Sequence, residues 1–139
     1  MILKRAEIEK RIPQGSVLRL DTLEVDEDGK FARGFLRVTK DQCFGNSEKP
    51  LKWIPTEMLV QTFVIAYHER YDPNVSISLF TIDPIDRSPM ELGELVVAET
   101  TLTKIEPNFL VARGLVVVGN RTITEADEMI FELNKSNGK

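Results

Sequence analysis

The chain has 139 residues, of which 42% are hydrophobic and 29% charged, a balance typical of a single globular domain over residues 1–139. The net charge of −4 argues against nucleic acid as a partner, because phosphate binding needs a clustered basic surface. No apolar run approaches the roughly 20 residues that cross a bilayer, and Glu7 and Glu9 break the pattern of a signal peptide, so we expect a cytoplasmic protein that binds no membrane.

The first part of the chain predicts a short helix followed by a hairpin. The first twelve residues favour a helix, which Pro13 and Gly15 end because proline lacks the helical N–H and glycine favours a turn. We expect strands over residues 17–25 and 30–39, joined by a turn in which Gly29 adopts a positive φ. A loop over residues 40–54 follows.

A second, longer helix is predicted from Pro55 to about Arg70. Its body, residues 58–67, is apolar nearly all round, which indicates a helix buried on most sides rather than a striped surface helix. Thr56 is expected to cap its N-terminus, and proline is tolerated in a first turn because the missing N–H would be unpaired there.

The remainder of the chain predicts sheet. We expect strands over residues 75–83, 93–105, 109–118 and 122–133, an irregular connection over 84–92, a hairpin turn at Gly119 and Asn120, and a frayed tail over 134–139. One apolar helix and one antiparallel sheet bury their surfaces best when the sheet wraps around the helix, so the fold class is α+β with about five to six strands. An exposed edge on such long strands favours pairing with a second copy.

Several short motifs then resemble one known family in their order and spacing. These are Ile12-Pro13 with Val17–Asp21, Leu23–Gly29 with Ala32–Gly34, Val38–Phe44, Trp53-Ile54-Pro55-Thr56, and Gly93-Glu94-Leu95. Over nearly the whole chain they are similar to the 3-hydroxyacyl-(acyl carrier protein) dehydratases, lyases of fatty acid biosynthesis. The resemblance implies a hotdog fold, an acyl thioester carried by acyl carrier protein or CoA, and a homodimer with each active site built across the interface.

The resemblance also shows that the helix lacks the family's acid. The family places a Glu or Asp six residues after the proline of its Met-Pro-Gly motif, and here that position is Gln61. An amide forms hydrogen bonds but cannot exchange protons near neutral pH. The family glycine, whose N–H receives the thioester carbonyl, is replaced by Thr56, which retains a backbone N–H at the helix end.

The loop before the helix lacks the family's histidine. Counting eight residues back from Pro55 reaches Ser47, whereas matching the family glycine reaches Asn46, and Glu48 beside them is the only one of the three that ionises. The predicted catalytic positions are therefore Asn46, Ser47, Glu48 and Gln61, and the predicted substrate-binding residues are Phe44, Trp53, Ile54, Pro55 and Thr56. No metal-ligand spacing or phosphate-binding loop is found, so we expect no cofactor and no metal.

Other interpretations of these residues stay open. Gln61 lines an acyl cavity or is a satisfied core amide, and Glu48 is a substitute base or part of a solvated loop. His68, the only histidine, is interpreted as a helix C-terminal residue, and Cys43, the only cysteine, as a small buried hydrophobe.

Three functions follow from these interpretations. The first is a catalytically impaired dehydratase relative that binds acyl thioesters or pairs with an active relative. The second is a hotdog thioesterase that uses Thr56, Glu57, Asn46 or Glu48. The third is an altered dehydratase in which Glu48 replaces the histidine.

Overall fold

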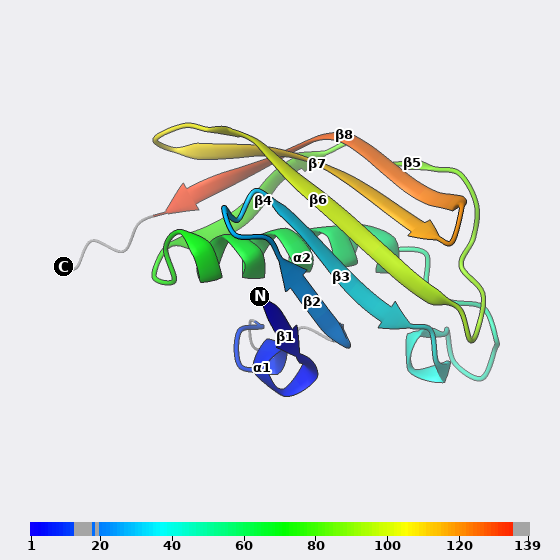
Figure 1. Ribbon diagram of the computed structural model, residues 1–139. Helices are drawn as coiled ribbons and strands as arrows, with labels where there is room; N and C mark the ends of the chain where they lie inside the picture. Colours follow the sequence, from blue (N-terminus) through cyan, green and yellow to red (C-terminus); the bar gives the residue numbers. More distant parts are fainter. Residues whose placement is uncertain (13–17, 19, 135–139) are drawn as a thin grey trace.

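A long helix lies across one face of an antiparallel sheet in the computed structural model, which describes residues 1–12, 18 and 20–134 (Figure 1). The elements in chain order are β1 Ile2–Lys4, α1 Arg5–Glu9, β2 Thr22–Val25, β3 Phe31–Arg37, the short 3-10 helix η1 Lys40–Gln42, α2 Ile54–Arg70, β4 Ser76–Ile82, β5 Ile85–Asp86, β6 Leu95–Ile105, β7 Phe109–Val118 and β8 Arg121–Asn134. The predicted helix stop at Pro13 and Gly15 lies outside the described residues, as do residues 135–139 of the predicted tail. Asn134, which the prediction also assigns to that tail, is instead the last residue of β8.

The strands form one sheet in the order β1-β2-β3-β6-β7-β8-β4, with β5 also paired to β8. Every neighbouring pair is antiparallel, which confirms the predicted architecture. The predicted strand number was too low, because the described sheet has eight strands. The additional β1 and β5 have three and two residues, which is too short to produce a recognisable alternation.

The N-terminal helix is shorter than predicted. Residues Ile2–Lys4 are a strand because they pair with Thr22–Glu24, a partner that no local pattern reveals. Only Arg5–Glu9 is helical, and Ile8 on it is fully buried.

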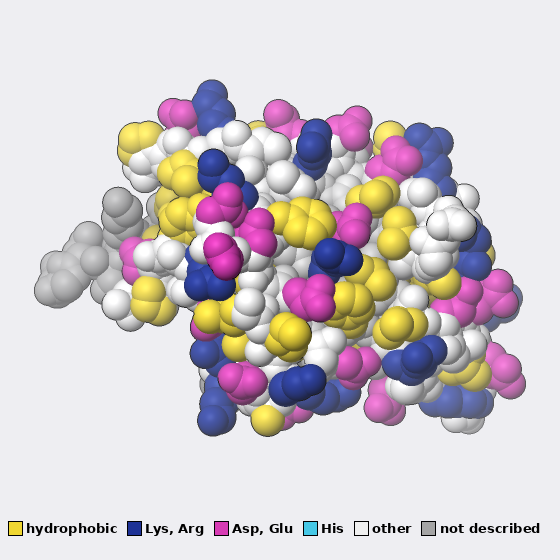
Figure 2. Space-filling view, viewed as in Figure 1, with side chains coloured by type: hydrophobic (Ala, Val, Ile, Leu, Met, Phe, Trp, Pro, Cys, Tyr) yellow, Lys and Arg dark blue, Asp and Glu magenta, His cyan; other side chains and the backbone are white. Residues whose placement is uncertain are grey.

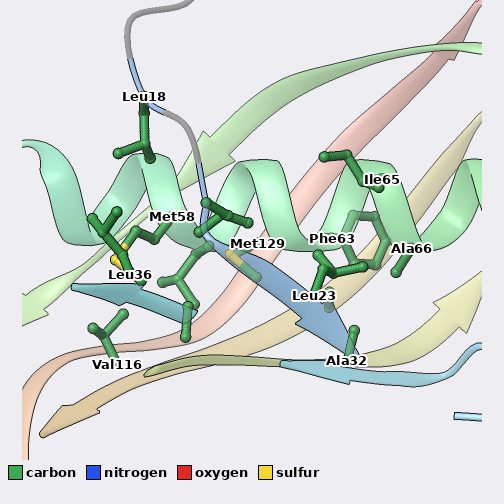
Figure 3. Close-up of a cluster of buried hydrophobic side chains, with 14 of the residues drawn as sticks. Leu18, Leu23, Ala32, Leu36, Met58, Phe63, Ile65, Ala66, Val116 and Met129 are labelled. Carbon is green, nitrogen blue, oxygen red and sulfur yellow. The ribbon is translucent and has the colours of Figure 1, made fainter. Parts of the chain in front are cut away.

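Helix α2 confirms the predicted long buried helix. Figure 3 shows Leu18 on the side of α2 opposite Val116 of the sheet. The backbone of Leu18 and Leu20 is hydrogen-bonded to the Gln61 side chain on this helix. Residues 58–67 are buried except for Val60 and Val64, which are half-buried, and this extensive burial explains why the helix is apolar nearly all round. Phe63 stacks on Phe131 of β8 with ring centroids 4.4 Å apart.

Two glycines in the sheet allow α2 to approach closely. A Cβ on Gly114 of β7 would lie 2.6 Å from Leu59 Cδ2, and a Cβ on Gly34 of β3 would lie 2.2 Å from Thr62 Oγ1. Real side chains do not tolerate such contacts, so these positions set the distance between helix and sheet.

The start of α2 differs in one detail from the prediction. The helix begins at Ile54, Trp53 occupies the N-cap without a side-chain hydrogen bond, and Pro55 lies in the first turn. The prediction that Thr56 caps the helix is therefore wrong, because Thr56 already lies inside the first turn. No helix among the described residues is long and apolar enough to cross a membrane.

Basic and acidic side chains are interspersed on the face of the molecule shown in Figure 2, with hydrophobic side chains between them.

Candidate functional site

A pocket of about 720 Å³ opens at the N-terminal end of α2. One wall is the loop before the helix, and the other is the connection from β5 to β6 together with the start of β8. Its lining residues are Glu48, Lys49, Pro50, Leu51, Lys52, Pro55, Asp86, Arg87, Ser88, Pro89, Met90, Glu91, Leu92, Ile123 and Thr124. Of the residues predicted from the sequence, Glu48 and Pro55 line this pocket.

The loop wall is held by its own backbone. The Phe44 N–H donates to the Lys49 carbonyl at 3.1 Å, and the Leu51 N–H donates to the Gln42 carbonyl at 2.7 Å. The Ser47 hydroxyl donates to the Phe44 carbonyl at 2.7 Å. These bonds close the loop and place Glu48 at the rim of the pocket, where its side chain is exposed.

The strand wall is anchored on β8. The Arg87 N–H donates to the Ile123 carbonyl at 2.8 Å, and the Ser88 hydroxyl donates to the Thr122 carbonyl at 2.7 Å. The Thr124 hydroxyl donates to Asp86 Oδ1 at 3.0 Å.

A further ion pair fixes the far end of this wall. Arg121 contacts the Glu94 carboxylate at 2.7 Å and also donates to the Pro89 carbonyl at 3.2 Å. The hydrogen bond from Arg121 holds the pKa of Glu94 below its ordinary value. The connection that the sequence presents as irregular is therefore tied down at several points.

Sequence reasoning missed Asp86, Ser88 and Thr124 as pocket residues. Asp86 and Thr124 are separated by 38 positions and meet only through the pairing of β5 with β8. The segment over 84–92 carries no motif that a sequence comparison could have used, and only the register of the sheet brings these groups together.

Gln61 has a different environment from the pocket. Its side chain is 5% exposed, its Oε1 accepts from the Leu20 N–H at 3.1 Å, and its Nε2 donates to the Leu18 carbonyl at 3.1 Å. It is not among the pocket-lining residues. Of the two interpretations left open, this geometry is that of a satisfied core amide, which holds the N-terminal segment against α2.

The other predicted site residues are dispersed around the start of α2. Phe44 and Trp53 are 74% and 42% exposed, Ile54 is buried in the core and Thr56 is half-buried. Asn46 lies exposed on the loop, beside Ser47. None of these lines the pocket, and their contact with a substrate stays a prediction.

Two ionisable side chains, Glu57 and His68, lie near opposite ends of α2. Glu57 in the first turn is half-buried, and burial raises the pKa of its carboxyl. His68 lies at the other end of the helix, where its Nε2 is 2.8 Å from the Val75 carbonyl, so it ties the helix end to the segment before β4. Cys43 is buried, as predicted.

Comparison with solved structures identifies the fold. The dehydratase heterocomplex ApeI:P from Xenorhabdus doucetiae has a chain that matches with a TM-score of 0.73 and 13% identity over 92% of this chain and 91% of that chain. The fluoroacetyl-CoA-specific thioesterase FlK matches with a TM-score of 0.68 and 12% identity over 81% and 90%. A thioesterase from Haemophilus influenzae matches with a TM-score of 0.65 and 11% identity over 81% and 78%.

These likenesses confirm that the chain has the hotdog fold. No protein-family model matches the sequence, and no curated protein is similar to it in sequence.

Proposed function

We propose that the protein binds acyl thioesters in the pocket at the start of α2. The observation that carries this proposal is the pocket itself, whose volume of about 720 Å³ falls in the range of ligand pockets. Leu51, Met90 and Ile123 offer an apolar lining, while charged side chains surround them. A thioesterase and a dehydratase have similar folds, and this likeness supports a thioester as the ligand.

We further propose that the protein does not dehydrate its ligand by the mechanism of the dehydratase family. Gln61 stands at the family's acid position, cannot ionise, and uses both ends of its amide on backbone groups. His68 is the only histidine of the sequence and lies at the opposite end of α2 from the pocket. The role that we propose first, in fatty acid or polyketide-type metabolism, is binding of an acyl carrier protein or CoA thioester.

We propose that the protein forms a homodimer through β4. The alternative to be tested is that an active relative takes the place of the second copy. β4 is an edge of the sheet, and its residues Ser76–Ile82 include no charged side chain. Leu79 and Phe80 on it are 36% and 66% exposed. A long, uncharged and apolar edge strand favours pairing with another strand.

Binding is tested with decanoyl-CoA and with a thioether analogue that cannot be hydrolysed. We expect Leu92→Trp to block binding, because Leu92 lines the pocket, and Leu95→Trp to leave it unchanged, because Leu95 is a comparably exposed leucine outside it. The proposal fails if neither ligand binds or if both variants behave alike. Efficient interconversion of 3-hydroxyacyl and 2-enoyl thioesters would rule out the impaired dehydratase.

The pocket position of Glu48 favours a second candidate, in which the protein is an active enzyme. Glu48 is then either the base of a thioesterase or the substitute for the dehydratase histidine. Glu48→Gln is expected to abolish release of thiol in the first case and dehydration in the second. Unchanged turnover in this variant excludes both.

A further inference from the structure

The pocket holds a carboxylate, Asp86, on the two-residue strand β5, which pairs with β8 in the wall opposite the loop that carries Glu48. We infer that Asp86, positioned by the Thr124 hydroxyl, is a base that activates water against a thioester bound in the pocket. This inference rests on the proposed function and adds hydrolysis to binding.

The position of Asp86 follows from the register of β5 on β8. Asp86 pairs directly with Thr124, and both residues line the pocket. Thr124 is 1% exposed, and its hydroxyl donates to Asp86 Oδ1 at 3.0 Å. The next residue, Arg87, bonds through its N–H to the Ile123 carbonyl. Backbone and side chain of this short segment are both anchored, which is the arrangement that holds a reacting group in place.

Asp86 forms no ion pair with any described residue. The neighbouring cation, Arg87, contacts Glu125 at 3.3 Å instead, and none of the ion pairs within the described part of the chain includes Asp86. Oδ1 of Asp86 accepts a hydrogen bond from the Thr124 hydroxyl, and Oδ2 has no hydrogen bond to any described residue. An ionised carboxylate with one oxygen held and the other available can accept a proton from water.

Glu48 is less suited to the same step. It lies on an exposed loop, and its side chain forms no hydrogen bond with any residue that the structure describes. Groups on strands are held more accurately than groups on loops. Asp86 is also exposed, and Glu91 is a third carboxylate that lines the pocket. Among the described residues, only the Asp86 carboxylate of these three is held by a hydrogen bond from another residue.

Hydrolysis at this site balances without any further reactant. The water oxygen bonds to the thioester carbonyl carbon while one water proton passes to Asp86. The tetrahedral intermediate then breaks its C–S bond, and the proton on Asp86 passes to the departing sulfur. The products are a carboxylic acid and a free thiol, and Asp86 returns to its ionised form.

The experiment measures thiol release from hexanoyl-CoA and decanoyl-CoA by the full chain and its variants. Asp86→Asn is expected to lower kcat by about 100-fold or more, the typical contribution of a general base, while binding of the thioether analogue changes less than about threefold. Asp83→Asn is the matched control, because Asp83 is an exposed carboxylate between β4 and β5, three residues before Asp86, that does not line the pocket. It should hydrolyse at the wild-type rate.

Thr124 is tested as a positioning residue. Thr124→Val removes the hydroxyl and is expected to lower kcat with little change in KM, and Thr124→Ser should restore the rate because it keeps the hydroxyl. A general loss of structure would not be rescued in this way.

The inference is overturned if the wild-type protein binds the analogue without hydrolysing either thioester, or if Asp86→Asn hydrolyses normally. Loss of hydrolysis in Glu48→Gln with normal rates in Asp86→Asn assigns the base to Glu48 and also overturns it. Failure to bind the analogue would instead refute the proposed function itself.

Discussion

Replacing Gln61 tests whether its amide holds the N-terminal segment onto α2. Gln61→Met retains the length of the side chain and removes both hydrogen bonds, so no large cavity forms. The buried Leu20 N–H loses its acceptor, which costs about 1–3 kcal/mol, and the lost bond to the Leu18 carbonyl adds about 0.5–1.5 kcal/mol. We expect a loss of about 2–4 kcal/mol, a large part of the roughly 5–15 kcal/mol of a typical domain.

In Gln61→Glu, one of the two hydrogen bonds depends on pH and the other does not. The introduced carboxylate still accepts from the Leu20 N–H, but it faces the Leu18 carbonyl and can donate to it only when protonated. Burial and this carbonyl raise the pKa of the introduced carboxyl in the folded state. The loss of stability caused by ionising this carboxyl is therefore absent below the unfolded-state pKa of about 4.3 and grows as pH rises to the folded-state pKa.

Urea unfolding followed by circular dichroism, at one protein concentration and at pH 4 and pH 7, measures both effects. Thr56→Ala is the control on the same helix, because its half-buried side chain forms no hydrogen bond with any described residue, and it should change stability by less than about 0.5 kcal/mol. Equal stability of Gln61→Met and the wild type would refute the role of the amide as a clamp.

Further predictions concern the helix–sheet contact, the sheet edge and the half-buried carboxyl of Glu57. Gly114→Ala should destabilise the protein by about 1–3 kcal/mol through overpacking against Leu59, and urea unfolding should show a smaller cost in a Leu59→Ala background; equal costs would contradict the contact. Phe80→Asp should dissociate the proposed dimer in analytical ultracentrifugation, since it places a charge on the apolar edge, and an unchanged mass would exclude β4 as the interface. Glu57→Gln should stabilise the protein at pH 7, because burial raises the pKa of Glu57 and so penalises its ionised form. The gain in unfolding free energy should vanish below pH of about 4, where the carboxyl is protonated in the folded and the unfolded state. A gain that persists at that pH would point to another cause.

Local patterns in the sequence were sufficient for most secondary structure. The apolar body of α2, the alternation of β6, β7 and β8, and the turn at Gly119 each depend on residues within one element or one turn. The short strands β1 and β5 could not be predicted, because pairing with distant partners stabilises them rather than their own propensity.

The candidate site was predicted only in part, for the same physical reason. The resemblance drew attention to the start of α2, and Glu48 and Pro55 line a pocket there, while their contact with a substrate stays a prediction. It could not show that Gln61 bonds to backbone groups 41 and 43 positions away. Nor could it show that Asp86 would meet Thr124 across the strand pair.

The sequence by itself thus determined the buried helix and the antiparallel sheet, because hydrophobic periodicity is a local property. That Gln61 and the histidine-free loop stand in for a catalytic pair stays a prediction from the resemblance. The tertiary structure alone decided which polar groups share the pocket and which are bonded in the core. Those contacts depend on strand register and on the path of the chain around α2, which the packing of the whole core sets.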